Sequence, residues 1–369
     1  MNDTARPRVC VIGGGIVGSA AALALARRAA RVVLLERFEA RHRRGGSHGS
    51  SRIFRLAYDQ PDYARMAQLA LPLWRRLEEE TAATLLDITG GVDHGDPTAV
   101  KEVARGLEQA GSPGTMLDAS EAARRWPGMR FDGDVLFQPL AGRLHADMAL
   151  ATFQSAAAAS GAQLRFGSPA TGVRESSNGV DVETPDGVHA ADVVVVACGA
   201  WTSGLVGSLV PIPPLVVTEE LPVHFAPRDS TLPWPSFVHH RASGVMYGLA
   251  APGDEGVKVG EHHAGCPVDP DRRPAEPDLA ACERVSEYVS EWLPGLDPTP
   301  RSWAGCLYDT TPTEDFVIDR RGRLVIAAGT SGHGFKFAPI LGEMVADLVF
   351  GGSQHLARFR LPEPAAGRG

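Results

Sequence analysis

The chain has 369 residues, which is long enough for about two domains, and its 44% hydrophobic and 22% charged residues are typical of a soluble globular protein. Its net charge of −8 argues against general affinity for nucleic acid, and no apolar run approaches the length of a membrane span. Five cysteines without a CxxC pair indicate neither a disulfide framework nor a zinc site. The first predicted strand begins by Val9 and leaves no room for a signal peptide, so we expect a cytoplasmic protein.

The N-terminal stretch has the order strand, glycine turn, helix and strand that is typical of a dinucleotide-binding unit. An apolar strand at residues 8–12 enters the turn, an alanine-rich helix follows at residues 19–30, and a second strand at residues 32–35 ends on Glu36. The glycines of the turn are Gly13, Gly15 and Gly18. They allow the backbone to approach a pyrophosphate at the helix N-terminus, and the Glu36 carboxylate would accept hydrogen bonds from a ribose. The fingerprint distinguishes neither NAD from FAD nor, on its own, a nucleotide site from a βαβ unit without a ligand.

Residues 37–55 are basic, rich in glycine and serine, and not periodic, which predicts an ordered loop rather than a helix or strand. A basic loop can be a solvated surface or a nucleic-acid patch, but the acidic balance of the rest of the chain argues against the patch. Because the loop follows the strand that would hold the ribose, we interpret it as wrapping a bound cofactor.

Periodicity predicts the remaining elements. Helices are expected at residues 63–83, 98–110, 120–126 (capped by Asp118 or Ser120), 146–160, 277–292 and 338–350. Strands are expected at residues 87–95 (with a turn), 162–166, 179–184, 190–197, 216–223, 235–238, 245–249, 257–260 and 324–329. The continuous valines of 190–197 are typical of a strand buried on both faces of a parallel sheet, whereas the alternating strands between 211 and 303 indicate a mixed or antiparallel sheet.

The sequence therefore predicts an α/β protein in which buried-strand segments recur at the start, middle and end of the chain. Residues 1–80, 145–212 and 304–360 are assigned to a discontinuous Rossmann-like cofactor-binding domain with a parallel sheet, residues 81–144 and 213–303 to an α+β substrate domain, and residues 361–369 to a loose tail. A ligand at the interface of two such domains is the default expectation.

Four separated motifs follow one another along the chain. They are the glycine turn with Glu36, residues 46–55, Tyr247 with residues 258–262, and residues 306–308 with 312–319 and 329–337. Through these motifs the chain resembles, over nearly its whole length, the monomeric sarcosine oxidase and N-methyltryptophan oxidase family of D-amino-acid-oxidase-like flavoproteins. The resemblance implies FAD as cofactor, an amino-acid-like substrate and O2 as partners, and a monomer that binds neither nucleic acid nor a membrane.

The resemblance also implies roles for individual residues. FAD contacts are implied for Gly13, Gly15, Ile16, Val17, Gly18, Glu36, Arg37, Ser47, His48, Arg52, Val173, Gly199, Trp201, Cys306, Gly332, Gly334, Phe335 and Lys336. Catalytic roles are implied for Lys258, Arg52, His48, His262 and Tyr247. Substrate contacts are implied for Arg55, Lys336, Tyr308, Tyr247 and Glu261.

Some of these residues have ordinary alternatives. Cys306 matches the cysteine that carries the flavin through its 8α-methyl group in the family, but a buried thiol without a ligand is the common fate of a cysteine. Arg55 and Lys336 match the pair that holds the substrate carboxylate, and either residue alone could be a solvated surface charge. Lys258 matches the lysine that promotes reaction with oxygen, and periodicity does not exclude a place on the solvent face of a strand.

The sequence departs from the family pattern at two places. Ser50 and Ser51 stand where an acidic residue and a threonine are common, and Glu261 is unexpected beside His262. If Glu261 points inward, it would shift the substrate preference toward a basic or hydrogen-bonding side chain. The His262–His263 pair could suggest a metal site, but strand neighbours point to opposite faces, so we predict no metal.

We therefore expect an FAD-dependent oxidase that converts an N-methyl or cyclic secondary amino acid to an imine and reduces O2 to H2O2. The alternatives are a flavin-dependent amino-acid dehydrogenase that passes electrons to a carrier, a non-catalytic dinucleotide-binding module, and an NAD-dependent dehydrogenase. The flavin colour, its bleaching by an amino acid and the formation of peroxide discriminate among them.

Overall fold

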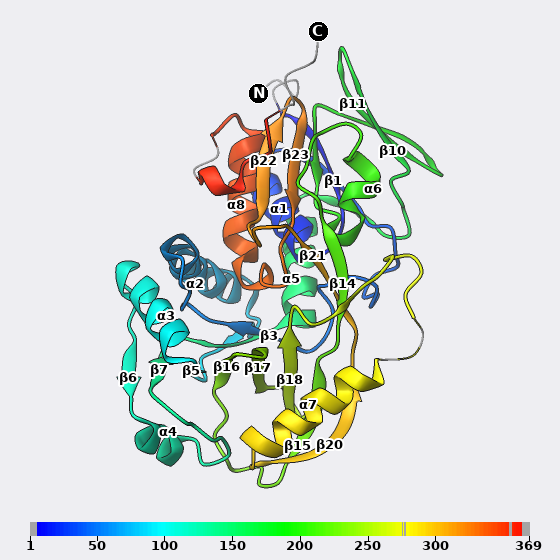
Figure 1. Cartoon of the computed structure of the whole chain (residues 1–369). Helices are drawn as coiled ribbons and strands as arrows, with labels where there is room; N and C mark the ends of the chain where they lie inside the picture. Colours follow the sequence, from blue (N-terminus) through cyan, green and yellow to red (C-terminus); the bar gives the residue numbers. More distant parts are fainter. Residues whose placement is uncertain (1–5, 275, 277, 354–355, 364–369) are drawn as a thin grey trace.

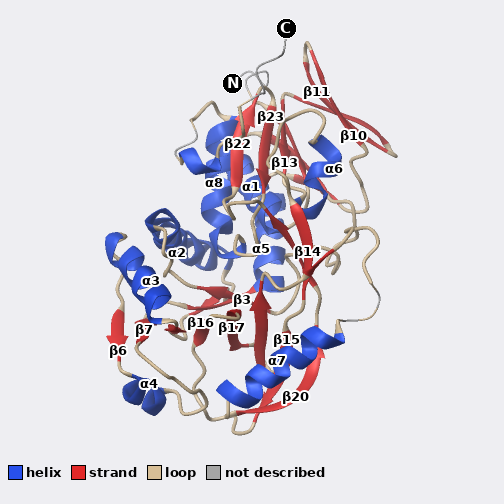
Figure 2. Ribbon diagram, in the orientation of Figure 1, coloured by secondary structure: helices blue, strands red, loops and turns tan. Residues whose placement is uncertain are grey.

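Six strands of the computed structural model, which describes residues 6–274, 276, 278–353 and 356–363, form a central sheet. Their bounds are β1 (Arg8–Ile12), β2 (Arg31–Leu35), β9 (Gln163–Arg165), β13 (Val193–Val196), β22 (Val317–Arg321) and β23 (Leu324–Ala328). The strand order is β22-β23-β13-β1-β2-β9, parallel throughout except for β22 (Figures 1 and 2). The start, middle and end of the chain all contribute to this sheet, so the predicted discontinuous parallel sheet is confirmed.

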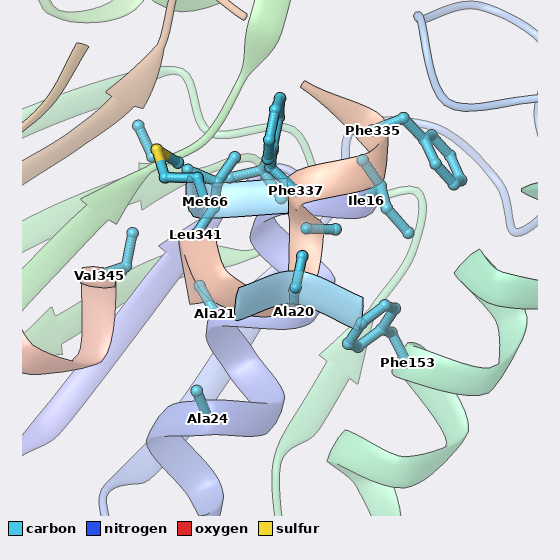
Figure 3. Close-up of a cluster of buried hydrophobic side chains, with 14 of the residues drawn as sticks. Ile16, Ala20, Ala21, Ala24, Met66, Phe153, Phe335, Phe337, Leu341 and Val345 are labelled. Atoms are coloured by element: carbon cyan, nitrogen blue, oxygen red, sulfur yellow. The ribbon is translucent and has the colours of Figure 1, made fainter. Parts of the chain in front are cut away.

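Three helices, α1 (Ile16–Arg27), α5 (Ala146–Ala159) and α8 (Ala338–Val349), pack on one face of the central sheet. Nearly all of α1 is buried because its alanines let α5 and α8 approach closely. Figure 3 shows Ala20 of α1 between the larger side chains of Phe153 and Phe337. Each of these helices begins and ends within a few residues of its predicted range.

The opposite face of the central sheet packs against a β-meander and a short helix. The bounds are β10 (Gly172–Ser176), β11 (Gly179–Thr184), β12 (Gly187–Ala191) and α6 (Thr202–Val206). The single strand predicted at residues 190–197 is wrong, because Asp192 separates β12 from β13 and the two strands belong to different sheets. The continuous valine run itself is the fully buried β13, as predicted.

Eight strands of the described chain form a second, largely antiparallel sheet in the lower half of Figure 1. Their bounds are β5 (Gly91–Gly95), β6 (Thr115–Leu117), β7 (Val135–Gln138), β15 (Val223–Pro227), β16 (Ser236–Arg241), β17 (Gly244–Ala250), β18 (Val257–His262) and β20 (Leu296–Trp303). The order is β20-β15-β18-β17-β16-β5-β7-β6, and β5 and β16 form the parallel pair. The predicted mixed sheet between residues 211 and 303 is thus confirmed, with β5 to β7 joining it from earlier in the chain.

Helix α7 (Leu279–Trp292) packs along this sheet through Val285, Tyr288 and Val289. The side chain of Asp278 caps α7, and the first residue of the predicted range, 277, lies outside the described residues. Helix α2 (Pro61–Thr81) packs on α8, whereas α3 (Pro97–Gln109) and α4 (Ala119–Arg125) lie beside the second sheet. Of the two predicted caps of α4, it is Asp118 whose side chain accepts a hydrogen bond from the backbone N–H of Glu121.

Two small sheets lie between the large ones. They comprise β3 (Ser51–Phe54), β4 (Leu86–Asp87) and β8 (Gly142–His145), and β14 (Val216–Glu220), β19 (Cys266–Pro267) and β21 (Cys306–Thr310). The prediction of a loop throughout residues 37–55 is wrong at its end, because β3 pairs with β8. The expected strand at 216–223 is likewise divided between β14 and β15, which belong to different sheets.

The predicted loose tail is wrong for its described part, residues 361–363. Leu361 is buried, and its backbone N–H donates to the Asp319 carboxylate over 2.9 Å. Residues 364–369 lie outside the described residues. The predicted domain boundaries stay a prediction.

Candidate active site

The glycine turn after β1 is held by close backbone contacts. Gly13 has a φ of +107°, and a Cβ on it would lie 2.2 Å from the carbonyl oxygen of Ala197. A Cβ on Gly18 would lie 1.9 Å from the carbonyl oxygen of Gly13, so helix and turn pack as tightly as the fingerprint requires. The buried Glu36 carboxylate accepts hydrogen bonds from the backbone N–H of Gly14 (2.6 Å) and of Phe38 (2.9 Å).

A cavity of about 300 Å³ extends from this turn to the face of β17 and β18. The predicted cofactor, substrate and catalytic residues all lie in the described part of the chain. All but three of them line this cavity. The glycine turn and Glu36 border it together with Cys306 at the start of β21 and Lys336 just before α8. The structure therefore brings the four sequence motifs together around one enclosed space.

The three exceptions are Gly18, Val173 and Glu261. Gly18 lies inside α1, behind the turn, and Val173 is buried in the core between β10 and the central sheet. Glu261 lies on β18 beside His262, but strand neighbours point to opposite faces. Its carboxylate forms an ion pair with Arg284 of α7 over 3.1 Å, outside the cavity, so an effect of Glu261 on the cavity by pointing inward is ruled out by this arrangement.

Two cations of the cavity converge on one tyrosine that the sequence analysis missed. The ammonium of Lys336 donates to the Tyr58 hydroxyl (2.9 Å) and to the carbonyl oxygen of His333 (2.8 Å). The guanidinium carbon of Arg55 lies 4.5 Å from the centroid of the Tyr58 ring. Burial and then the nearby Arg55 charge lower the pKa of Lys336 well below its ordinary value, and an anion bound beside the ammonium would raise that pKa again.

A second group of charges surrounds Cys306. Arg52 Nη2 donates to the backbone carbonyls of Gly46 (2.9 Å) and His48 (2.7 Å) and lies 3.6 Å from the Cys306 sulfur. The buried ammonium of Lys258 donates to the carbonyl oxygen of Ser51. Burial, and then the charge of Arg52, lower the pKa of Lys258 to about 7. The chain has three lysines in all, and two of them, Lys258 and Lys336, line this cavity.

Burial favours the neutral form of four further side chains of the cavity, two histidines and two tyrosines. Burial lowers the pKa of His48 to about 4 and that of His262 well below its ordinary value. It raises the pKa values of Tyr247 and Tyr308, which therefore keep their hydroxyl protons. Among the described residues, His48 Nε2 has no hydrogen-bond partner although it is buried, which marks it as a group that a bound molecule can satisfy.

Two glycines leave space for the rings of Tyr247 and Tyr308, which line the cavity. A Cβ on Gly260 would lie 2.8 Å from the Tyr247 hydroxyl, and a Cβ on Gly332 would lie 2.1 Å from the ring of Tyr308. Gly332 also has a φ of +75°, so both space and backbone conformation require glycine there.

A group of potential metal ligands lies on the far side of β5 and β16. One ligand atom each of His94, Asp132 and His239 lies within 4.8 Å of the others. The imidazole rings of His94 and His239 stack with centroids 4.0 Å apart at 26°. Their in-plane lone pairs therefore run nearly side by side instead of converging on one ion. The predicted absence of a metal stays a prediction.

Sequence analysis did not identify Tyr58, Asp93 or Gln138, whose contacts cross between elements. Asp93 stands between Val92 and His94 in a predicted strand, and a charged residue within a strand is a signal for a buried charge with a partner. No helix of the described chain is both long and apolar enough to cross a membrane.

Comparison with known proteins agrees with this site. The model of the FAD dependent oxidoreductase family matches residues 8–348. The chain is 33% identical over 362 residues to the monomeric sarcosine oxidase of Streptomyces avermitilis, covering 94% of each chain. It is 31% identical over 349 residues to N-methyl-L-tryptophan oxidase of Yersinia pestis, covering 91% of this chain and 93% of the relative.

Solved structures show the same fold. NikD, described as an unusual amino acid oxidase essential for nikkomycin biosynthesis, superposes with a TM-score of 0.86 at 28% identity and covers 96% of this chain and 97% of its own. L-proline dehydrogenase from P. horikoshii superposes with a TM-score of 0.83 at 25% identity and covers 96% of both chains. Together with the glycine turn and the cavity it opens into, these matches show that the chain belongs to the FAD dependent oxidoreductase family.

Proposed function

We propose that the protein is an FAD-dependent oxidase of a secondary amino acid, with an N-methyl or cyclic amine. The observation that carries the proposal is the meeting of Arg55 and Lys336 at Tyr58, inside the cavity that leads to the glycine turn. Two cations held in a buried space are matched by an anionic ligand group, and the carboxylate of an amino acid supplies it. The names of the sarcosine oxidase and N-methyl-L-tryptophan oxidase relatives support the same substrate class.

The residues present fit FAD. The N-terminus of α1 and the glycine turn offer backbone N–H groups for the pyrophosphate, and Glu36 stands at the end of β2 where a ribose would lie. The buried, unsatisfied His48 nitrogen and the Arg52 guanidinium border the same cavity near Cys306. When bound, FAD would supply the redox chemistry, accepting a hydride equivalent from a C–H bond next to the substrate nitrogen and passing the electrons to O2.

The chain itself positions the substrate and selects its protonation state. With Arg55 and Lys336 on the carboxylate, a protonated amine would meet a cavity that already holds buried cations, so binding favours the neutral amine. No strong base is then needed to remove a proton from nitrogen. The neutral imidazole of His262 and the protonated hydroxyls of Tyr247 and Tyr308 can hydrogen-bond the substrate without carrying charge.

We assign Lys258 to the reaction with oxygen. Its ammonium is buried and fixed on the carbonyl oxygen of Ser51, so it needs no reorganisation when O2 gains negative charge beside it. We also propose that Cys306 carries the FAD covalently, since its sulfur is enclosed at the edge of the cavity next to Arg52.

The second candidate is an amino-acid dehydrogenase, which the similarity to L-proline dehydrogenase from P. horikoshii favours. The buried lysine at position 258 favours the oxidase. Purified protein is tested with a panel of N-methyl, cyclic and aromatic amino acids, measuring peroxide and, in parallel, reduction of an artificial electron acceptor. Peroxide formed in equal amount to substrate consumed supports the oxidase. Flavin bleaching with electrons reaching only the acceptor supports the dehydrogenase, and no bleaching with any amino acid contradicts both.

We further propose that the enzyme is a monomer, in line with the name of the Streptomyces avermitilis relative. The mass of the purified holoenzyme, measured by light scattering during gel filtration, tests this, and a mass near twice the 39.1 kDa of one chain contradicts it.

A further inference from the structure

We propose that Asp93 is a positioning residue that sets the direction of the Arg55 guanidinium, and with it the binding of the substrate carboxylate. The inference rests on the proposed function, because it takes Arg55 as a carboxylate ligand. Asp93 lies on β5, is 1% exposed, and faces the cavity side of the eight-stranded sheet.

Three hydrogen-bond donors meet on the Asp93 carboxylate. Its Oδ1 atom lies 3.3 Å from Arg55 Nη1 and 3.0 Å from His240 Nε2. Its Oδ2 atom accepts a 2.6 Å hydrogen bond from Gln138 Nε2. A guanidinium has five N–H donors, so the contact with Asp93 uses one edge of Arg55 and leaves others for an incoming carboxylate.

The same network fixes the backbone that follows Arg55. Gln138 Oε1 accepts hydrogen bonds from the backbone N–H groups of Leu56 (3.0 Å) and Ala57 (2.8 Å). Gln138 therefore connects the Asp93 carboxylate to the segment that carries both Arg55 and Tyr58. The Asp93 carboxylate thus contacts the side chain of Arg55 directly and, through Gln138, the main chain that follows Arg55.

The position of Asp93 requires a side chain that accepts hydrogen bonds on both of its terminal atoms and donates none. The two N–H groups of Leu56 and Ala57 fix the Gln138 amide so that its Nε2 atom faces Asp93. In Asp93→Asn, one orientation of the new amide would place NH2 against Gln138 Nε2, and the other would place it against Arg55 and His240. In the first orientation the hydrogen bond with Gln138 is lost and Arg55 keeps only a neutral acceptor, and in the second the contact with Arg55 itself is lost, so the hold on the guanidinium is weakened in both.

The charge of Asp93 acts in the same direction as its geometry. Arg55 and Lys336 both approach Tyr58, and two cations in a buried space repel each other. The Asp93 carboxylate, within 3.3 Å of Arg55 Nη1, offsets part of that repulsion.

The test measures the binding of acetate, a carboxylate without an oxidisable amine, and of acetamide, its neutral counterpart, to the holoenzyme by the change in flavin absorbance. The variants are Asp93→Asn, Asp93→Glu, Arg55→Ala and the Asp93→Asn/Arg55→Ala double variant, with the exposed Asp186→Asn as control. The KM and kcat of the best amino acid from the oxidase panel are measured for each.

We expect Asp93→Asn to raise the acetate Kd and the substrate KM about 10-fold, the scale of a small misplacement of a binding group, with FAD content kept and kcat within about threefold. Asp93→Glu, which keeps the charge and the acceptor, should recover part of the loss. Acetamide binding and Asp186→Asn should be unaffected. In the Arg55→Ala background, Asp93→Asn should change the acetate Kd less than twofold, because its effect runs through Arg55.

An unchanged acetate Kd in both Asp93 variants, with Arg55→Ala still weakening acetate, overturns the inference and leaves the proposed function standing. Additive effects of Asp93→Asn and Arg55→Ala also overturn it, since they would mean that Asp93 acts independently. If Arg55→Ala leaves the acetate Kd unchanged and the parent protein oxidises no amino acid of the panel, the proposed function itself is contradicted. If Asp93→Asn does not retain FAD, Asp93→Ser, which removes the charge and one acceptor, takes its place, and normal acetate binding by it contradicts the positioning role.

Discussion

The ammonium of Lys336 donates a 2.9 Å hydrogen bond to the hydroxyl of Tyr58, over whose ring the guanidinium of Arg55 also lies. Burial raises the pKa of Tyr58 to about 12, so its hydroxyl stays protonated and neutral between two cations. Tyr58 therefore fixes the two cations relative to each other without cancelling either charge. An anion placed between them gains from both.

Replacing either cation should weaken carboxylate binding. Arg55→Ala or Lys336→Met is expected to raise the substrate KM about 30-fold or more, which corresponds to the loss of roughly 2 kcal/mol or more when one partner of a buried charge pair is removed. Steady-state kinetics in the peroxide assay measures this. Lys101→Met, at an exposed lysine of α3, is the matched control and should leave KM unchanged. A KM in Lys336→Met equal to that of the control would exclude Lys336 as a carboxylate ligand.

Lys258→Met should slow the reaction with oxygen and spare the reaction with substrate. We expect the oxygen step, followed in a stopped-flow instrument after anaerobic reduction, to fall by about 100-fold or more, the effect of removing a preorganised charge-stabilising group. Anaerobic reduction by substrate should stay within about threefold of the parent rate. Equal loss in both half-reactions would contradict the assignment of Lys258 to oxygen.

The same lysine should give the oxygen step a pH dependence. Its pKa is lowered to about 7 by burial and by Arg52, so the ammonium that stabilises negative charge is present at low pH and lost as the pH rises through the pKa. The electrons stored in the reduced cofactor add negative charge nearby, which moves the pKa up again. The rate constant should therefore fall with rising pH, with a midpoint no lower than about 7. The Lys258→Met enzyme should lack this fall, and an identical profile in both enzymes would assign the titration to another group.

Cys306→Ser should remove the covalent link to the flavin. After precipitation with acid, the yellow colour of the parent protein is expected in the pellet, and that of Cys306→Ser in the supernatant. Cys282→Ser, at a half-buried cysteine of α7 away from the cavity, is the control and should retain colour in the pellet. Colour in the supernatant of the parent protein would show that the flavin is bound without a covalent bond.

The contact between α1 and α8 depends on a glycine. A Cβ on Gly342 would lie 2.7 Å from backbone atoms of Ala20, so Gly342→Ala must separate the two helices. We expect a loss of about 1–3 kcal/mol in the free energy of unfolding, seen as a lower melting temperature. Gly204→Ala, in α6 where no atom lies within 4 Å of the new Cβ, is the control and should melt at or above the parent temperature. Equal melting of both variants would mean that the helices move apart at little cost.

The segment 257–262 shows what sequence patterns could predict. Lys258 and His262 are two strand repeats apart and share a face, while Val257, Val259 and Glu261 share the other. The structure places the first pair at the cavity and packs the second set toward α7. Strict use of the two-residue period would therefore have placed Glu261 outside the cavity from the sequence alone.

The network around Asp93 could not be read from any local pattern. Asp93 is 38 residues from Arg55, 45 from Gln138 and 147 from His240 along the chain. The contact with His240 arises because β5 pairs with β16 in parallel, and the contact with Gln138 arises because β5 also pairs with β7, although both partners lie far away in the sequence. The sequence did not predict β3 for a related reason. This short strand is stabilised by pairing with β8, about 90 residues later, and its own sequence has no strand periodicity.

The distribution of lysines in this chain has a practical consequence. Lys258 and Lys336 are buried, whereas Lys101 is exposed on α3. Reagents that acylate amines should therefore couple the folded protein to a solid support through Lys101, leaving the two cavity lysines unmodified. An electrode or bead prepared in this way would carry enzyme molecules in few orientations, with the cavity chemistry intact.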